Sequence, residues 1–514
     1  MPLPIPEPRT LGLPHDTWRP EQPEAIRVAL ESDRAHTALQ LPTGAGKSAI
    51  GVGIARLTEG RVPTLTSTKG LQTQYAEGYG LYDMRGASNY VCLSAQDEHK
   101  PYFPIRKEVG CDEGACRSDI RCSRLEAGCL YFDRYREGVR QAQPVTSYAY
   151  WLSTRRFAKG FGVAARLICD EAHALPAELM AACRIEIKKP WLGEARPPRS
   201  LRAWREWASL RLAEFTPLVE DERQRVRYRR QLDAIGMLDR VHHETWAWED
   251  AGDRYVFEPL SPVGLLPLLG PATLPILYLS ATVTPAVLAL MGVPSDDVRF
   301  FTAPSRFPAV RRPVYVVPTA RIDARSWRDP DVRAYWLHRI DQILERRQDR
   351  KGIVHSVSYE RQQAIATGSA HRHRMIVPTS AAQLERAVRH FRQAPPGTIL
   401  VSPSVTTGWD FPYTDCEYQI LAKVPFPDTR ARIARARLDA HPEWRDYVTM
   451  QAIVQAAGRG MRAEDDQCET FIVDDHFKWF YRSSSGQAYA PEAFREAVQT
   501  VRVLPDPPPP LLRG

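Results

Sequence analysis

Long hydrophobic runs are missing from this chain. No stretch of about 18 or more consecutive apolar residues occurs, so the sequence contains no candidate transmembrane helix. Residues 1–19 alternate proline with charged residues and lack the apolar core of a signal peptide, so we expect a cytoplasmic rather than a secreted protein. The nine cysteines then stand in a reducing compartment, where clustered thiols indicate metal binding or catalysis more than disulfides.

Lysine is also scarce. Only 10 of the 69 basic residues are lysines, so a lysine inside a motif stands out. The hydrophobic fraction of 43% and the charged fraction of 25% are ordinary for a globular protein and exclude wholesale disorder. A length of 514 residues predicts about three domains of roughly 150 residues each. The net charge of +8 is compatible with a polyanionic partner but does not establish one.

Short apolar segments alternate with helical stretches, and no internal repeat is present. This alternation predicts an α/β fold with parallel sheets flanked by helices. Three stretches break it: a cysteine-rich, loop-like segment (85–145), a helical segment rich in arginine and tryptophan (196–262), and a proline-rich tail (505–514) that we expect to be extended and disordered. A linker near residues 303–308 separates two α/β units. The expected strands are residues 36–41, 63–67, 166–169, 276–279, 352–356, 375–377, 398–401, 419–424 and 470–473.

A glycine-rich loop follows the first expected strand. It reads Leu41-Pro42-Thr43-Gly44-Ala45-Gly46-Lys47-Ser48 and leads into a helical pattern over residues 47–57. Small residues let successive backbone N–H groups face phosphate oxygens, and the helix N-terminus adds its dipole. Lys47 would reach the β- and γ-phosphates, and the Ser48 hydroxyl would bind Mg²⁺. Leu41 replaces the glycine that usually begins the longer pattern, so the strand–loop–helix context is what predicts an ATP site.

An acidic pair follows another expected strand, in the run Asp170-Glu171-Ala172-His173. An acid at the carboxyl end of a buried strand is suited to hold Mg²⁺ through water, and the next carboxylate is suited to polarise the attacking water. Alone, such a pair would more often cap a helix. Together with the glycine-rich loop, it predicts the acidic residues of an ATPase.

These motifs resemble those of superfamily 2 helicases of the DEAH type, and the resemblance continues toward the C-terminus. It implies an adenine-reading element, a strand-binding motif, a motif coupling ATP to unwinding, and the fifth and sixth helicase motifs. Single later motifs are weak, but seven in this order over some 440 residues are specific. Arg19 and Gln22 match the adenine-reading element, residues 66–72 the strand-binding motif, and Ser280-Ala281-Thr282 the coupling motif. Residues 402–410 match the fifth motif and residues 455–462 the sixth.

The sixth motif supplies arginines to the reaction in such helicases. Lys47 and Mg²⁺ neutralise charge on the transferred phosphoryl group from one side only. Arg459 and Arg462 are about one helical turn apart, so both can face a cleft between two domains. An arginine reaching across that cleft would make hydrolysis depend on domain closure. The resemblance therefore implies six catalytic residues, which are Lys47, Asp170, Glu171, Gln455, Arg459 and Arg462.

Five of the nine cysteines cluster in the segment 85–145. No CxxC pair occurs among them, so the usual zinc-ribbon spacing does not fit. Four thiolates from irregular loops can hold a 4Fe–4S cluster. The position of the segment, between the strand-binding motif and the acidic pair, resembles the DinG/XPD family of iron–sulfur helicases and implies such a cluster, with zinc as the alternative. The five are Cys92, Cys111, Cys116, Cys122 and Cys129.

Five cysteines for four positions leave one unassigned. The contexts of Cys92 and Cys129 resemble the two ends of the family's cluster domain. Counting back from Cys129 adds Cys122 and Cys116 and leaves Cys111 spare, with Cys111 in place of Cys116 as the alternative. The remaining cysteines, predicted to be small core residues, are Cys169, Cys183, Cys416 and Cys468.

Contacts to nucleic acid are less specified by the sequence. Hydroxyls, amides and backbone N–H groups on phosphate would grip a strand without sequence preference. Aromatic side chains could stack on bases, although core packing is the better explanation for any single one. A basic segment could touch phosphate or form a solvated helical face. The candidates are Lys69, Gln72, Tyr75, Thr406 and Thr407 along the strand, Tyr90 and Tyr148 for stacking, and the basic segment 223–230.

Taken together, the resemblance implies two RecA-like P-loop motor domains with an iron–sulfur insertion and a small helical arch-like insertion. It implies a monomeric, ATP-driven DNA helicase that moves 5′→3′ on single-stranded DNA, acts at duplex junctions and uses ATP, Mg²⁺ and a 4Fe–4S cluster. The alternatives are a translocase that displaces proteins or serves a CRISPR-type complex, and a non-enzymatic metal-stabilised binding protein. The expected divisions are motor domain 1 (1–84, 146–195 and 263–302), the iron–sulfur insertion (85–145), the arch-like insertion (196–262), motor domain 2 (303–504) and the tail (505–514).

Overall fold

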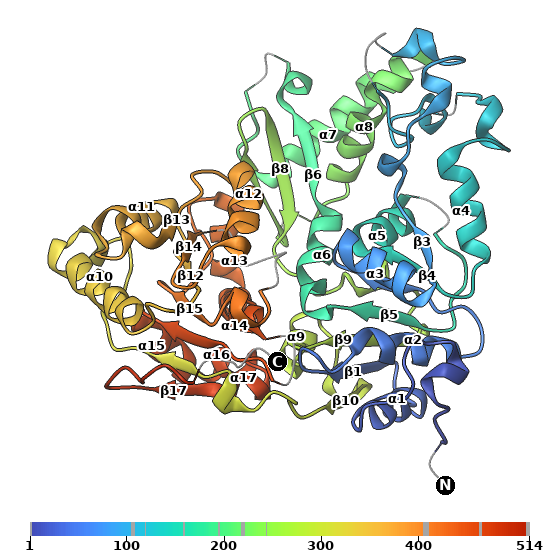
Figure 1. Ribbon diagram of the computed structural model, residues 1–514. Coiled ribbons are helices and arrows are strands. Elements are labelled where there is room, and N and C mark those ends of the chain that lie inside the picture. The colour runs from blue at the N-terminus through green and yellow to red at the C-terminus, as the bar shows by residue number, and fades with distance from the viewer. Residues whose placement is uncertain are drawn as a thin grey trace.

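The computed structural model contains two α/β units, each built on a parallel sheet, and it confirms the predicted fold class (Figure 1). Two insertions extend from the first unit on the side away from its N-terminus. No helix among the described residues is long and apolar enough to cross a membrane. The described residues are 3–103, 108–118, 120–157, 160–193, 196–216, 222–242, 244–403, 411–461 and 465–509.

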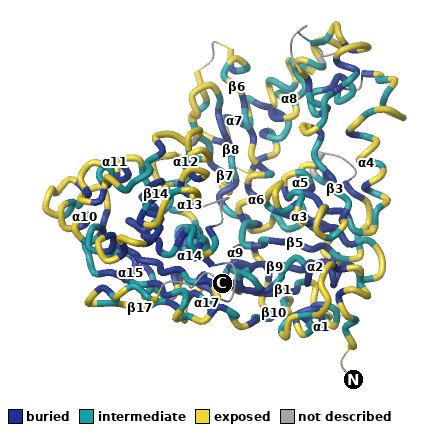
Figure 2. The backbone as a smooth tube through the Cα atoms, in the orientation of Figure 1, coloured by how far each residue is buried: buried dark blue, intermediate teal, exposed yellow. Residues whose placement is uncertain are grey.

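The first unit has a seven-stranded sheet in the order β10-β1-β9-β5-β2-β4-β3. Strands β2, β5 and β9 are buried along their whole length, as parallel strands covered on both faces are (Figure 2). Because parallel strands end at one edge of a sheet, the loops after β1, β5 and β9 are neighbours. The strands are β1 (His36–Gln40), β2 (Thr64–Thr66), β3 (Tyr82–Met84), β4 (Pro144–Ser147), β5 (Leu167–Asp170), β9 (Ile276–Ser280) and β10 (Val298–Thr302).

Local sequence signals set the ends of several helices around this sheet. The Thr68 hydroxyl accepts a hydrogen bond from the backbone N–H of Leu71 and so caps α3, which ends at Gly80 with a φ of 72°. Helix α2 begins at Lys47, directly after the phosphate loop, and its residues 49–55 are buried. The helices are α1 (Gln22–Leu30), α2 (Lys47–Leu57), α3 (Lys69–Tyr79), α5 (Tyr148–Phe157), α6 (Leu175–Cys183) and α9 (Pro285–Leu290).

The second unit repeats the design with the strand order β13-β14-β12-β15-β16-β11-β17. A fully buried ion pair between Arg347 and Glu469, with N···O of 2.7 Å, ties the end of α10 to β16. The strands are β11 (Val314–Val316), β12 (Gly352–His355), β13 (Met375–Ile376), β14 (Ile399–Ser402), β15 (Tyr418–Leu421), β16 (Glu469–Ile472) and β17 (Val498–Thr500). The helices are α10 (Pro330–Glu345), α11 (Tyr359–Gly368), α12 (Ala381–Gln393), α13 (Arg432–Ala440), α14 (Pro442–Ala457), α15 (His476–Arg482), α16 (Ser484–Ala488) and α17 (Glu492–Ala497).

The proline-rich tail lies against this second unit. The Arg347 guanidinium donates a hydrogen bond to the carbonyl of Pro505 at 3.3 Å, and Arg350 donates to the carbonyl of Pro508. Proline leaves backbone carbonyls without an internal partner, and the two arginines supply donors for them. The prediction of disorder is therefore wrong for the described part of the tail.

The second insertion is not purely helical, which corrects the sequence prediction. Its helices pack on a three-stranded antiparallel sheet in the order β6-β8-β7, whose hairpin turns at Gly252 with a φ of 90°. Trp204 is fully buried between helices and sheet, with its ring 5.5 Å from Trp248 and 5.1 Å from Phe257. The elements are β6 (Ile185–Lys188), α7 (Leu201–Phe215), α8 (Glu222–Leu238), β7 (Trp246–Asp250) and β8 (Arg254–Pro259).

The two insertions contact each other, and the second also contacts the second unit. On α8, Arg230 forms ion pairs with Asp112 at 2.5 Å and Glu113 at 3.2 Å of the cysteine-rich segment. On the other side, Arg437 of α13 pairs with Glu258 at 2.8 Å. Part of the basic segment predicted to touch phosphate is thus paired with carboxylates. The cysteine-rich segment itself consists of short 3-10 turns and ends in α4 (Leu130–Arg140).

Candidate functional site

The phosphate loop, residues 41–46, connects β1 to α2 in a conformation that needs glycine twice. Gly44 and Gly46 have φ values of 82° and 76°. A Cβ atom would lie 2.6 Å from the ring of Phe307 at Gly44 and 2.4 Å from the amide of Gln22 at Gly46. Side chains therefore fit at neither position, and the backbone is left free to approach a phosphate.

Both residues of the adenine-reading element contact this loop directly. The buried Gln22 donates from its amide to the carbonyl of Ala45 at 2.8 Å and accepts from the backbone N–H of Arg19 at 2.9 Å. The Arg19 guanidinium donates to the carbonyl of Gly44. These bonds hold the loop in place, so reading an adenine would require one of the two side chains to exchange its partner. Adenine recognition by them stays a prediction.

The acidic pair lies at the carboxyl end of β5, beside α2. Asp170 is buried and accepts a hydrogen bond from the hydroxyl of Tyr75 at 2.9 Å. Glu171 has a φ of 52°, a left-handed conformation that is uncommon for a residue with a side chain. One of its carboxylate oxygens is 4.0 Å from the ammonium of Lys47, and the other is 3.2 Å from His173. Such strain is found mostly where function places a side chain.

The pKa values of the two carboxyl groups are shifted in opposite directions. Burial, and then the neighbouring charge of Glu171, raise the pKa of Asp170. Burial also opposes the charge on Glu171, but Lys47 and His173 outweigh it and lower the pKa of this residue. Glu171 is therefore ionised at neutral pH, as a residue that polarises water must be.

Residues of the second unit contact the segments beside the acidic pair. The amide of Gln455, on α14, is 3.3 Å from Nε2 of His173, whose Nδ1 is 2.9 Å from the hydroxyl of Ser280. The amide of Gln451, one turn earlier on α14, donates to the carbonyl of Thr282 at 3.2 Å. The structure thus connects the acidic pair, the Ser280–Thr282 motif and the sixth motif in one network.

Arg459, which was predicted to lie on a helix, lies in a 3-10 turn. Helix α14 ends at Ala457, and Gly458–Gly460 forms a 3-10 turn that carries Arg459. The positive charge of Arg459 contributes, after Lys47 and His173, to lowering the pKa of Glu171. Arg462, Thr406 and Thr407 lie outside the described residues.

All five cysteines of the first insertion line one small cavity. The Cys111 thiol is within hydrogen-bonding reach of both Cys92 and Cys129 and lowers the pKa of each to about 6. Its own pKa is raised, chiefly by the bond to Cys129. A Cβ on Gly114 would lie 3.1 Å from the sulfur of Cys92 and 3.6 Å from that of Cys116. Cys111 is thus central to the group, where counting along the sequence left it spare.

The donor set fits an iron–sulfur cluster. All five sulfurs are free thiols although they surround one cavity. Soft thiolates from irregular loops are the ligands that such clusters use. The other four cysteines are buried, as predicted, but Cys416 and Cys468 lie within hydrogen-bonding reach of each other, which their sequence separation did not indicate.

Known proteins share parts of this sequence and this architecture. Residues 341–499 match the helicase C-terminal domain family. The structure is similar to an XPD helicase at 15% identity, with a TM-score of 0.59 over 94% of this chain and 100% of that chain. It is also similar to Xpd4 of S. tokodaii at 13% identity, with a TM-score of 0.55 over 94% and 98%. The chain has the fold of an XPD-type helicase. No curated protein sequence matches it.

Gln72 and Tyr75 were expected along a nucleic-acid strand but are turned inward in this XPD-type helicase fold, which corrects that prediction. The burial of Tyr148 agrees with the core packing favoured for single aromatic residues. Tyr75 and Tyr148 are fully buried, and both donate their hydroxyls to Asp170. Gln72 is buried and bonds to Asp83 at 2.6 Å. Lys69 is exposed at the start of α3 and donates to Asn89 at 2.7 Å, so it alone of these four is open to a strand.

Two contacts beside the ATP-binding motifs were not predicted from the sequence. Phe307, in the linker between the units, packs into the second unit beside Phe391 and Phe411 while its ring touches Gly44 of the phosphate loop. Tyr75 supports Asp170 from α3. A linker phenylalanine and a helical tyrosine carry no local signal for either role, because both depend on segments far away in the chain.

Proposed function

We propose that this chain is an ATP-driven DNA helicase that moves 5′→3′ on single-stranded DNA. One observation carries the proposal: the two units meet beside the acidic pair, where Gln455 of the second unit is 3.3 Å from His173, which is itself 3.2 Å from Glu171. A cleft formed by two units can couple hydrolysis to their closure, and closure can move a bound strand.

The roles of the residues follow from their positions. The backbone of the phosphate loop and Lys47 bind the phosphates of ATP. Ser48 and Asp170 would hold Mg²⁺, which neutralises charge on the phosphates. Glu171, ionised and held by Lys47 and His173, orients the attacking water and accepts its proton. Arg459 faces the developing charge from the opposite unit.

The iron–sulfur cluster is part of the same proposal. Cys92 and Cys129 would hold it with two of the other three thiols, and the central position of Cys111 favours including it. When bound, the cluster supplies folding energy to a segment that consists of short turns. The ion pairs from Asp112 and Glu113 to Arg230 then join this segment to the second insertion. The two insertions would present fixed surfaces to a passing nucleic-acid strand.

Unwinding assays on tailed duplexes test the function. We expect ATP-dependent strand separation of a duplex with a 5′ single-stranded tail and little of one with a 3′ tail, because a translocase can load only on the strand it follows. Hydrolysis stimulated by single-stranded DNA without separation of either duplex would instead favour a translocase that displaces proteins or serves a nucleic-acid-guided complex. Absence of hydrolysis would favour a binding protein.

Arginine substitutions test the coupling across the cleft. We expect Arg459→Lys and Arg462→Lys each to lower strand-stimulated hydrolysis on the order of a thousandfold, because an ammonium cannot reproduce the planar fork of a guanidinium. Nucleotide binding should persist, since the first unit binds the phosphates. Arg389→Lys, exposed on α12, is the matched control. Unchanged hydrolysis in either cleft variant would remove that arginine from the reaction.

A further inference from the structure

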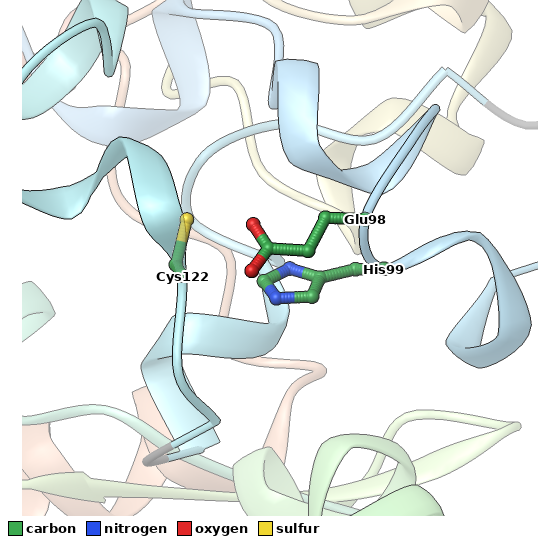
Figure 3. Close-up of side chains that lie close together, drawn as sticks. All are labelled: Glu98, His99 and Cys122. Carbon is green, nitrogen blue, oxygen red and sulfur yellow. The ribbon is translucent and has the colours of Figure 1, made fainter.

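Three side chains of different chemistry converge beside the cysteine cavity (Figure 3). A carboxylate oxygen of Glu98, a ring nitrogen of His99 and the sulfur of Cys122 all lie within 4.8 Å of one another. The ring of His99 lies alongside the carboxylate, and the sulfur faces both from a separate stretch of chain. Carboxylate, imidazole and thiolate are the three ligand types that zinc takes from proteins.

His99 is arranged as a metal ligand usually is. It is 2% exposed, and its Nε2 is 2.8 Å from the carbonyl oxygen of Arg121. A carbonyl only accepts, so Nε2 carries the proton and the neutral ring keeps its lone pair on Nδ1. Among the described residues Nδ1 has no hydrogen-bond partner, a costly state for a buried nitrogen. A histidine that binds metal with one nitrogen typically donates the other N–H to a carbonyl or carboxylate.

The other two side chains are also held by outer partners. The sulfur of Cys122 is 3.1 Å from the hydroxyl of Ser94, a buried residue. Glu98 accepts from the backbone N–H of Ser123 at 3.0 Å and from its hydroxyl at 2.9 Å. Each group is therefore oriented before any ion arrives, which is how the surroundings of a metal site fix its ligands.

We propose that Glu98, His99 and Cys122 form a mononuclear zinc site, distinct from the cluster held by the remaining four cysteines. A tetrahedral zinc would take these three ligands and one water. Its ligand atoms lie roughly 3.5 Å apart, so the present group would contract by about 1 Å. The Glu98 side chain is exposed and would lengthen or exchange its hydrogen bonds with Ser123 as it makes that movement. One carboxylate and one thiolate balance the charge of Zn²⁺.

This assignment gives the fifth cysteine a role. Cys111 is central among Cys92 and Cys129, whereas Cys122 is the thiol bonded to Ser94 and placed beside His99. The zinc would join residues 98–99 to residue 122 and so close the loop between them. The site does not depend on motor activity, but the division of the cysteines rests on the cluster proposed above.

Metal analysis of anaerobically purified full-length protein tests the site, with zinc and iron measured separately. We expect about one zinc and about four irons per chain. In Cys122→Ser, zinc should fall at least about tenfold while iron stays near four. Cys183→Ser, which alters a buried cysteine on α6 away from the cavity, is the matched control and should keep both zinc and iron. Glu98→Gln, altered at an exposed side chain, should weaken Zn²⁺ binding at least about tenfold in competition with a chelator.

Cobalt provides a readout independent of total metal content. Co²⁺ added to zinc-depleted protein should give a sulfur-to-cobalt charge-transfer absorption in the wild type and none in Cys122→Ser, compared as difference spectra. Loss of iron in Cys122→Ser, with or without loss of zinc, would place this cysteine in the cluster and overturn the proposal. Wild-type protein that binds neither Zn²⁺ nor Co²⁺ beyond the cluster would overturn it as well. Neither result bears on ATP hydrolysis, which is measured separately.

Discussion

Lys47→Ala and Glu171→Gln are each expected to abolish strand-stimulated ATP hydrolysis, by different routes. Glu171→Gln removes the ionised carboxylate that accepts the proton of the attacking water, a loss of about 10²- to 10⁴-fold in kcat. It spares the phosphate loop, so the affinity for ATP should be nearly unchanged. Lys47→Ala removes positive charge from the phosphates and should weaken ATP binding as well as hydrolysis. Hydrolysis with single-stranded DNA and equilibrium nucleotide binding distinguish the two variants.

Matched controls exist on the surface of the first unit and its insertion. Lys188→Ala on β6 and Glu77→Gln on α3 change the same residue types at exposed positions and should leave hydrolysis unchanged. Normal turnover in Glu171→Gln would remove this residue from catalysis, despite its strained backbone and its contacts with Lys47 and His173. Wild-type ATP affinity in Lys47→Ala would show that the phosphates bind elsewhere.

Cys92→Ser and Cys129→Ser are expected to lose the brown colour of the protein together with its iron. Serine lacks the soft thiolate that iron prefers, so three remaining ligands should not retain a 4Fe–4S cluster. The segment around the cavity is built of short turns and should unfold locally without it. The two parallel sheets have their own cores, so hydrolysis should continue while duplex unwinding fails.

Iron and acid-labile sulfide content, visible absorption and unwinding of a 5′-tailed duplex measure this outcome. Cys183→Ser, a buried cysteine on α6 away from the cavity, is the control and should keep both colour and unwinding. A colourless wild-type protein with zinc but no iron would contradict the cluster and leave the ATP-driven motor intact. Full unwinding by a variant without iron would show that the insertion does not separate strands.

The sheets could be predicted well from the sequence, and the reason is their burial. All nine expected strands are present, because parallel strands covered on both faces read as short, nearly continuous apolar runs. The two strands at the edges of the first sheet, β3 and β10, were not predicted, because they are only partly buried and lack such a run. The hairpin β7–β8 lies inside a segment that was predicted to be helical, although tryptophans such as the two in β7 are enriched in strands.

What the sequence alone determined is the set of motifs whose chemistry is local. Residues 41–48 need small side chains, a lysine and a hydroxyl in immediate succession, and the acidic pair needs only the strand before it. Tertiary structure decided which distant residues meet these motifs: Gln455 at His173, Phe307 at Gly44, and Cys111 between Cys92 and Cys129. It also turned Tyr75 and Tyr148 inward to Asp170. The physical reason is that a backbone turn or a strand end is specified by neighbouring residues, whereas a contact between residues hundreds of positions apart depends on how whole sheets and insertions pack.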